Sequence, residues 1–188
     1  MRERALRTTG IVLKRLAIGE SDRLVTIFTP SLGKITAMAK GIKKLSSRRA
    51  SHLELFNHVD LILYQTSTPL ITEVSTLQSF GQFRRNIVLA SLAFYVGEVV
   101  DKLLPDKQPH PQVFELLQSV LSDLNELGCE SDKTDKVRGE KIVKNFVSSL
   151  IWELGYLPFG QYPKVGLTAM VEEICERRVN SRKFLQES

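Results

Sequence analysis

Residues 9–41 read TGIVLKRLAIGESDRLVTIFTPSLGKITAMAKG, in which three apolar segments are separated by two short polar turns. The first two segments are rich in β-branched residues, and the third alternates small apolar and polar residues from Ile35 to Lys40. Both features are typical of β-strands. Gly19–Asp22 and Thr29–Gly33 have the composition of turns, so this stretch predicts three short strands in succession.

Two further strands are predicted at about 53–65 and 70–77, joined through Thr66–Pro69. The segment 41–51 interrupts the strand pattern with four cations among three serines and reads as a flexible loop. Five short strands with turn signals between them favour a small barrel or a sandwich over alternating strands and helices.

From about residue 84 the apolar period changes to 3.6, which predicts helices. The first helix ends before Pro105, and the second begins at Pro111 and stops at Gly128. A third ends at Gly155, and a last helix is expected over about 168–184. The sequence therefore predicts an α+β protein, with a β domain over 1–80 and a helical bundle over 81–188.

The positive charge of the chain is concentrated in its first 80 residues. The net charge is +5, yet residues 1–80 contain twelve Lys and Arg against six Asp and Glu, while residues 81–188 contain 14 against 15. Such asymmetry indicates an anionic partner for the first half, nucleic acid before membrane, because no basic amphipathic helix lies there. A basic surface that merely keeps the protein in solution is the alternative.

The expected phosphate contacts are cations on the predicted strands, turns and loop: Arg15, Arg23, Lys34, Lys40, Lys43, Lys44, Arg48 and Arg49. A small barrel with a cationic face and loop is a common way to bind single strands without sequence preference. Aromatic residues for base stacking are few in this half, and Phe28 and Phe56 are expected in the core. We therefore expect binding driven more by charge than by stacking.

No catalytic motif or metal-ligand spacing is recognisable. The three histidines are scattered, Gly33-Lys34 lacks the rest of a phosphate-binding loop, and Glu172-Glu173 diverge by about 100° on a helix. Cys129 and Cys175 stand alone, which fits a reducing compartment. No uncharged run exceeds twelve residues and no apolar leader follows Met1, so a cytoplasmic protein without enzymatic activity, cofactor or membrane span is expected.

The sequence of residues 9–41 also resembles that of the N-terminal domain of the RecO family of recombination mediators. The resemblance continues more weakly through the predicted helices. It implies that the five strands form an OB-fold barrel and that residues 81–188 correspond to the helical C-terminal domain of that family. Many members carry a four-cysteine zinc module after a helix ending like Leu154-Gly155-Tyr156. Here no cysteine follows nearby until the last helix, so zinc is not expected.

The resemblance implies a protein that binds single- and double-stranded DNA and anneals complementary strands. It also implies that the protein acts with RecR to load RecA onto DNA coated by single-stranded DNA-binding protein, whose acidic C-terminal tail such proteins bind. Lys141, Lys144, Arg177 and Arg178 offer a cationic rim for that tail, although a solvated helix face explains them equally well.

Two other functions stay open from the sequence. One is a protein-interaction scaffold that docks RecR and the coating protein with incidental DNA contact. The other is an RNA-binding OB-fold protein.

Overall fold

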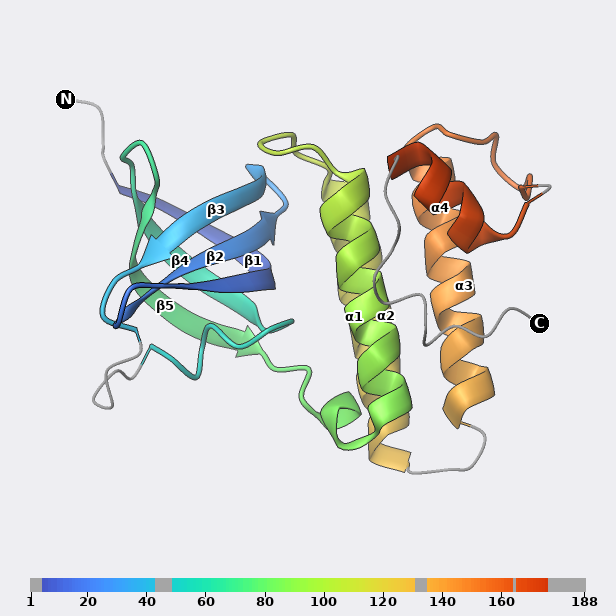
Figure 1. Cartoon of the computed structure of the whole chain (residues 1–188), viewed down its shortest axis with the longest axis horizontal. Helices are drawn as coiled ribbons and strands as arrows, with labels where there is room; N and C mark the ends of the chain where they lie inside the picture. The colour runs from blue at the N-terminus through green and yellow to red at the C-terminus, as the bar shows by residue number, and fades with distance from the viewer. Residues whose placement is uncertain (1–4, 43–48, 131–134, 164, 176–188) are drawn as a thin grey trace. The chain divides into compact units, whose positions relative to one another are not determined.

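The computed structural model describes residues 5–42, 49–130, 135–163 and 165–175 (Figure 1). The chain divides into two compact units. The first, here the barrel unit, comprises Met1–Ser79 and Pro105–Pro111, and the second, here the helical unit, comprises Phe80–Leu104 and Gln112–Ser188.

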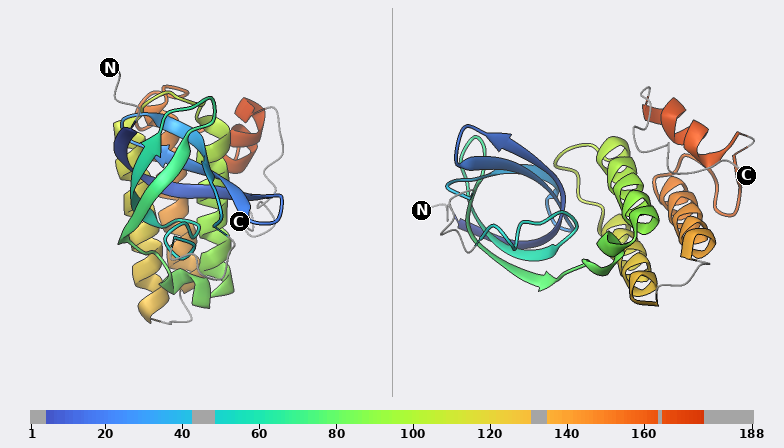
Figure 2. Two further views of the ribbon diagram at one scale, coloured as in Figure 1. Left: turned by 90° about the vertical axis from the view of Figure 1, so that its left-hand side faces the viewer. Right: turned by 60° about the horizontal axis from the view of Figure 1, so that its bottom comes forward.

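The barrel unit contains five strands that close into a barrel in the order β1-β2-β3-β5-β4 (Figure 2). Their bounds are β1 Ala5–Ile18, β2 Asp22–Thr29, β3 Gly33–Ala39, β4 His58–Tyr64 and β5 Leu70–Gln78. All neighbours are antiparallel except β3 and β5, which meet in parallel where Met38 pairs with Leu70. This is the topology of an OB-fold, so the predicted fold class is confirmed.

Alternation along the strands builds the interior of the barrel. In β2, Val25 and Ile27 are fully buried in the barrel core, and in β3 Ile35, Ala37 and Ala39 face the same interior. Intervening residues therefore point outward.

The predicted start of the fourth strand was wrong. We expected it from about residue 53, whereas β4 begins at His58. Phe56 is buried with φ of 65°, a left-handed conformation that no extended strand contains. Its N–H and the carbonyl of Asn57 instead bond the backbone of Val12, at 2.7 and 3.1 Å.

Residues 105–111, here called the strap, connect two helices but pack on the barrel. The N–H of Lys107 donates to the carbonyl of Lys34 over 2.9 Å, and Asp106 forms an isolated parallel bridge with Lys34. Gly33, with φ of 70°, lies so close to Gln108 that a Cβ would sit 2.2 Å from the carbonyl oxygen. The start of β3 therefore fits the strap only with glycine at this position.

Among its described residues, the helical unit contains a short 3-10 helix and four α-helices (Figure 1). Their bounds are η1 Gln82–Arg85, α1 Ile87–Leu103, α2 Pro111–Glu130, α3 Asp135–Glu153 and α4 Leu167–Cys175. Asn86 caps α1 by accepting from the N–H groups of Val88 and Leu89. Helices α1 and α3 approach closely at Gly139, where a Cβ would meet Leu92 at 2.8 Å.

The prediction that the second helix stops at Gly128 is wrong, because α2 continues to Glu130. Gly128 instead allows a close approach of the chain: a Cβ there would lie 2.7 Å from the backbone of Gln82 and Phe83. The expected continuation of the last helix to residue 184 lies outside the described residues. Within the described ranges, no helix combines the length and hydropathy that a membrane span requires.

Candidate nucleic-acid interface

A row of apolar side chains runs across the outer wall of the barrel. Register places Leu24 between Leu16 of β1 and Met38 of β3. Met38 in turn pairs with Leu70 of β5, and Leu70 pairs with Tyr64 of β4. On β2 to β5 these side chains point outward because their neighbours along each strand belong to the barrel core. Leu16 is 56% exposed and the other four are half-buried, so this apolar row offers a surface to a flat ligand.

On one side of the apolar row the same face becomes polar. Lys14 pairs with Thr26, and Thr26 pairs with Thr36, whose hydroxyl lies 3.5 Å away. Lys14 and Thr36 are exposed. This second row supplies a cation and two hydroxyl groups, which suit phosphate and sugar oxygens.

On the other side lies one of the predicted phosphate contacts, Lys40, which comes directly after β3 and is exposed. Arg23 pairs with Ala39 of the barrel core and alternates with Leu24, so it is half-buried on the opposite face of β2. The start of β2 is held near Lys40 because Asp22 accepts from the N–H of Gly41 over 2.8 Å. Cations therefore flank the apolar row on both sides. A strand crossing the row could place bases on it and phosphates beside the cations.

Lys34 is not available at this face. The residue is only 8% exposed, and its Nζ lies 3.5 Å from Oδ1 of Asp106 on the strap. Lys34 is thereby tied to the strap, and its ammonium has a carboxylate partner inside the barrel unit.

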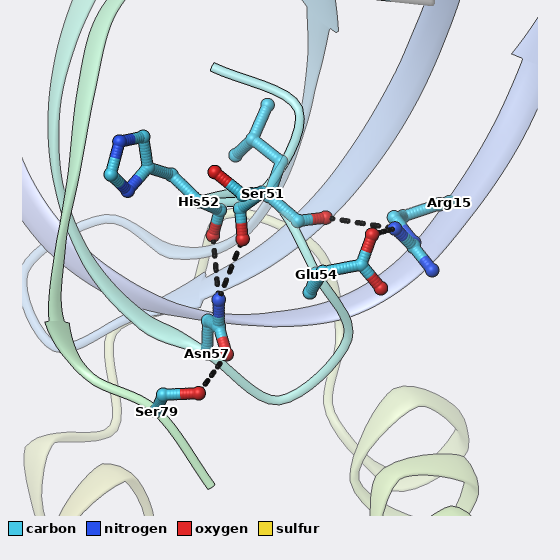
Figure 3. A network of polar contacts seen from close by, with 7 residues as sticks. Arg15, Ser51, His52, Glu54, Asn57 and Ser79 are labelled. Carbon is cyan, nitrogen blue, oxygen red and sulfur yellow. Dashed lines mark hydrogen bonds and ion pairs between the residues drawn. The ribbon is translucent and has the colours of Figure 1, made fainter. Parts of the chain in front are cut away.

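Arg15 is also engaged within the unit, as Figure 3 shows. Its guanidinium forms an ion pair with Glu54 and donates to the carbonyl of Leu53 over 3.4 Å. These contacts bind β1 to the segment before β4. Arg15 therefore stabilises the segment before β4, and its guanidinium does not extend freely into solvent.

Arg49 holds three backbone carbonyls. It donates to Lys40 over 2.9 Å, to Ile71 over 3.2 Å and to Thr72 over 3.5 Å. The first bond joins the two ends of segment 41–48, and the other two attach that junction to β5. Arg49 is therefore a clamp at the base of the predicted basic loop.

Asn57 completes the anchoring of the connection that precedes β4 (Figure 3). Its amide donates to the carbonyls of Ser51 and His52, at 3.1 and 3.0 Å, and accepts from the hydroxyl of Ser79. Asn57 is 3% exposed, so these bonds satisfy a buried polar side chain. His52 also bonds the hydroxyl of Thr76 in β5 over 2.9 Å, so residues 51–57 are fixed to both β5 and β1.

Of the eight predicted phosphate contacts, Lys43, Lys44 and Arg48 lie outside the described residues. Lys40 lies on the outer face and Arg23 on the opposite face of β2, while Arg15, Lys34 and Arg49 are bound within the barrel unit. The apolar row is the feature that sequence reasoning missed. Its signal was present in Leu16, Leu24 and Met38, apolar residues at outward positions of alternating strands.

The expected scarcity of stacking groups is confirmed on the barrel. Phe28 and Phe56 are buried as expected, at 0% and 2% exposed, and Phe80 is also fully buried. Tyr64, at the end of the apolar row, is half-buried. Stacking on this face therefore has one aromatic ring available among the described residues of the barrel unit.

The wall formed by β1 and β4 has a different chemistry. Arg7 binds the carboxylate of Asp60 through Nε at 3.1 Å and Nη2 at 2.6 Å. The hydrogen bonds that Arg7 donates lower the pKa of Asp60, and the same bonds raise the pKa of Arg7. Nearby, burial lowers the pKa of His58. Because Arg7 is already paired, this wall offers less to an anion than the face of β1, β2 and β3.

Across residues 5–42, 49–130, 135–163 and 165–175, His, Cys, Asp and Glu side chains nowhere form a group of three or more that could hold a metal ion.

Comparison with known families gives two matches along the chain. The sequence model described as Recombination protein O N terminal matches residues 1–80, and the one described as Recombination protein O C terminal matches residues 84–140. The first match covers the whole barrel sequence up to Phe80, including the outer face described above.

Curated relatives agree with these matches. The DNA repair protein RecO of Roseiflexus sp. is 36% identical over 159 residues, covering 84% of this chain and 53% of the relative. The protein of the same name from Dehalococcoides mccartyi is 31% identical over 153 residues, covering 81% of this chain and 57% of the relative. That from Bacillus pumilus is 36% identical over 129 residues, covering 68% and 50%. The chain spans about half the length of these relatives.

Proposed function

The chain belongs to the recombination protein O (RecO) family, and from this premise we propose that it is a DNA-repair recombination mediator that binds single strands and anneals complementary ones. The observation that carries the proposal is the outer face of β1, β2 and β3, where an apolar row is flanked by cations on both sides. We assign DNA binding to residues 1–80 and protein docking to residues 81–188.

The strand would lie across the apolar row. Bases would contact Leu16, Leu24 and Met38, while phosphates would meet Lys40 on one side and Lys14 on the other. Arg23, at the start of β2, would add positive charge at the end of the barrel next to Lys40. Lys43, Lys44 and Arg48 belong to the segment that follows Lys40 and would add further charge. Arg15, Lys34 and Arg49 would support the face from within the barrel.

Annealing by this route involves no covalent chemistry, so the protein need not be an enzyme. A cationic surface reduces the repulsion between two strands and raises their local concentration, which speeds pairing. Double-stranded DNA would bind through the same phosphate contacts, since those contacts do not read sequence.

The remaining partners follow from the family. We propose that the chain acts in the cytoplasm, at the nucleoid, with RecR, and that it binds the acidic C-terminal tail of single-stranded DNA-binding protein. RecA would be an indirect partner, because it would be loaded onto DNA coated by the single-stranded DNA-binding protein.

Fluorescence anisotropy with a labelled oligothymidylate, measured over a salt series, tests the proposal. We expect affinity to fall steeply with salt, and the same chain to accelerate annealing of complementary oligonucleotides without nucleotide cofactor. An affinity that salt does not change, together with no gain in annealing rate, would refute it.

The apolar row also supports a second function, a protein scaffold in which this face binds a peptide. Engagement of Arg15, Lys34 and Arg49 within the barrel unit reduces the charge offered to DNA and favours this alternative. The two are separated by testing whether the isolated chain retards bare oligonucleotides. Competition between DNA and RNA of equal sequence separates both from an RNA-binding protein, because only RNA carries the 2′-hydroxyl.

A further inference from the structure

A groove between α2 and α3 in the helical unit has no part in the DNA-binding proposal. It has a volume of about 630 Å³ and is lined by Gln112, Glu115, Leu116, Ser149, Trp152, Glu153 and Phe159. We call it the α2–α3 groove.

Aromatic rings form one end of the α2–α3 groove. The ring centroid of Trp152 lies 5.0 Å from that of Phe159 and 5.5 Å from that of Tyr162. The indole N–H donates to the carbonyl of Gln161 over 2.7 Å, which fixes the orientation of Trp152. Phe159 is nevertheless 88% exposed and Tyr162 68% exposed. Exposed aromatic side chains grouped in this way mark interaction surfaces.

The charge around the α2–α3 groove is negative. Glu115 and Glu153 are the charged residues in its lining, and both are exposed. Over its whole length α2 contains four Asp and Glu and no Lys or Arg, and residues 145–163 carry a single charged side chain, Glu153. Further along the exposed face of α2, burial and the nearby carboxylate of Glu126 raise the pKa of Asp123. This part of the helical unit is thus acidic in a chain whose net charge is +5.

We propose that the α2–α3 groove binds an arginine-bearing segment of a partner protein. A guanidinium can stack on the faces of Trp152 and Phe159 while its N–H groups donate to the carboxylates of Glu115 and Glu153. Leu116 supplies an apolar contact for the side chain next to the arginine. An acidic tail is repelled by the same carboxylates, so this surface is distinct from one that recognises anions.

Trp152 is the only tryptophan of the chain, so its fluorescence reports directly on the α2–α3 groove. The probe is the peptide acetyl-Ala-Leu-Arg-Ala-Leu-Arg-amide, titrated into the full chain. Its matched control has citrulline, a neutral isostere, in place of each arginine. We expect the arginine peptide to bind about tenfold more tightly than the citrulline peptide, with the difference reduced by added salt.

The variants assign the contacts. E115Q/E153Q keeps the shape of both exposed side chains and should weaken the arginine peptide by about fivefold to tenfold. F159A should weaken binding of the arginine peptide by a similar factor, because it removes the aromatic ring on which the guanidinium stacks. D123N/E126Q, an equal change of charge on α2 outside the lining, should bind as the parent chain does.

Three outcomes would overturn the proposal. The first is equal binding of the arginine and citrulline peptides or no binding, and the second is an unchanged affinity in E115Q/E153Q. The third is that the peptide binds only to a chain that is truncated after Cys175. Because residues 176–188 contain four Lys and Arg, this result would mean that they occupy the groove in the full chain. Sedimentation at the same concentrations must show a monomer, since self-association lost in E115Q/E153Q would assign the groove to a second copy.

Discussion

Arg49 donates through Nη2 to the backbone carbonyl of Lys40 at 2.9 Å, and so joins the two ends of the basic segment between them. The same guanidinium reaches the carbonyls of Ile71 and Thr72 on β5. One side chain therefore holds the start of this segment, its end and a barrel strand together. A lysine has the same charge, but it lacks the planar guanidinium with which Arg49 donates to three carbonyls at once.

We predict that Arg49→Lys lowers the free energy of unfolding by about 1–2 kcal/mol, although it conserves charge. The reason is the loss of two of the three backbone contacts. Urea denaturation followed by circular dichroism measures the change, and Lys40→Arg, which alters an exposed side chain nearby, serves as the control. Unchanged stability in Arg49→Lys would mean that the clamp does not contribute and that Arg49 is free to act as a phosphate contact.

Lys14→Glu/Lys40→Glu should weaken binding of single-stranded DNA by about tenfold and flatten its salt dependence. Each lost phosphate contact should reduce the slope of log K against log salt by about 0.7. Fluorescence anisotropy between low and moderate salt gives both quantities.

Lys141→Glu/Lys144→Glu is the matched control for the DNA-binding variant, since it changes the charge of two exposed residues on α3 by the same amount. It should leave the salt slope unchanged. A comparable loss in Lys141→Glu/Lys144→Glu would show that binding follows total charge rather than the face of the barrel.

Asp106→Asn should destabilise the protein by about 1 kcal/mol and leave DNA affinity unchanged. Lys34 is 8% exposed, and the variant removes the carboxylate 3.5 Å from its ammonium group. Asp106 itself is exposed, which limits the loss. Chemical denaturation and anisotropy on the same preparation separate the two effects. If Lys34→Met weakened DNA binding as strongly as Lys40→Glu alone, the structural assignment of Lys34 would be wrong.

The sequence indicated the fold well where the signal is local. Alternation and turn composition predicted five strands and the change to helices, and these are confirmed. It failed at Phe56 and Gly128, where distant contacts decide the local structure. Phe56 turns because its backbone bonds Val12, and position 128 holds a glycine because the backbone of Gln82 and Phe83 leaves no space for a side chain there, not because the helix ends.

The candidate interface was harder to predict than the fold. Charge counts identify cations, but not which of them have partners. Arg15 meets Glu54, and Lys34 meets Asp106, at sequence separations that no local pattern reveals. Lys40 reaches the edge of the apolar row only through the β2–β3 register and the bond between Asp22 and Gly41.

Acidification should destabilise the barrel through His58. Burial lowers the pKa of His58 below the ordinary value of 6.5, so the folded state favours the neutral imidazole. The unfolded chain therefore binds the proton more readily, and stability present above about pH 6.5 is lost as the pH falls through that value. We predict that the difference in unfolding free energy between the parent and His58→Gln is constant from pH 8 to 7 and then shifts in favour of the variant by pH 5. A constant difference over the whole range would contradict this.

Two glycines with left-handed backbones allow the strap contact to be separated from backbone strain. Gly33 and Gly19 have φ of 70° and 55°, and a Cβ would meet Gln108 at 2.2 Å at the first but nothing within 4 Å at the second. Alanine in a left-handed conformation costs about 1 kcal/mol by itself, so Gly19→Ala should lose about that amount. Gly33→Ala should lose at least about 2 kcal/mol more, because the strap or the start of β3 must move. Thermal and urea unfolding of the two variants measure the difference. Equal losses would show that the strap moves away from β3 at no cost in free energy and that residues 105–111 do not stabilise the start of β3.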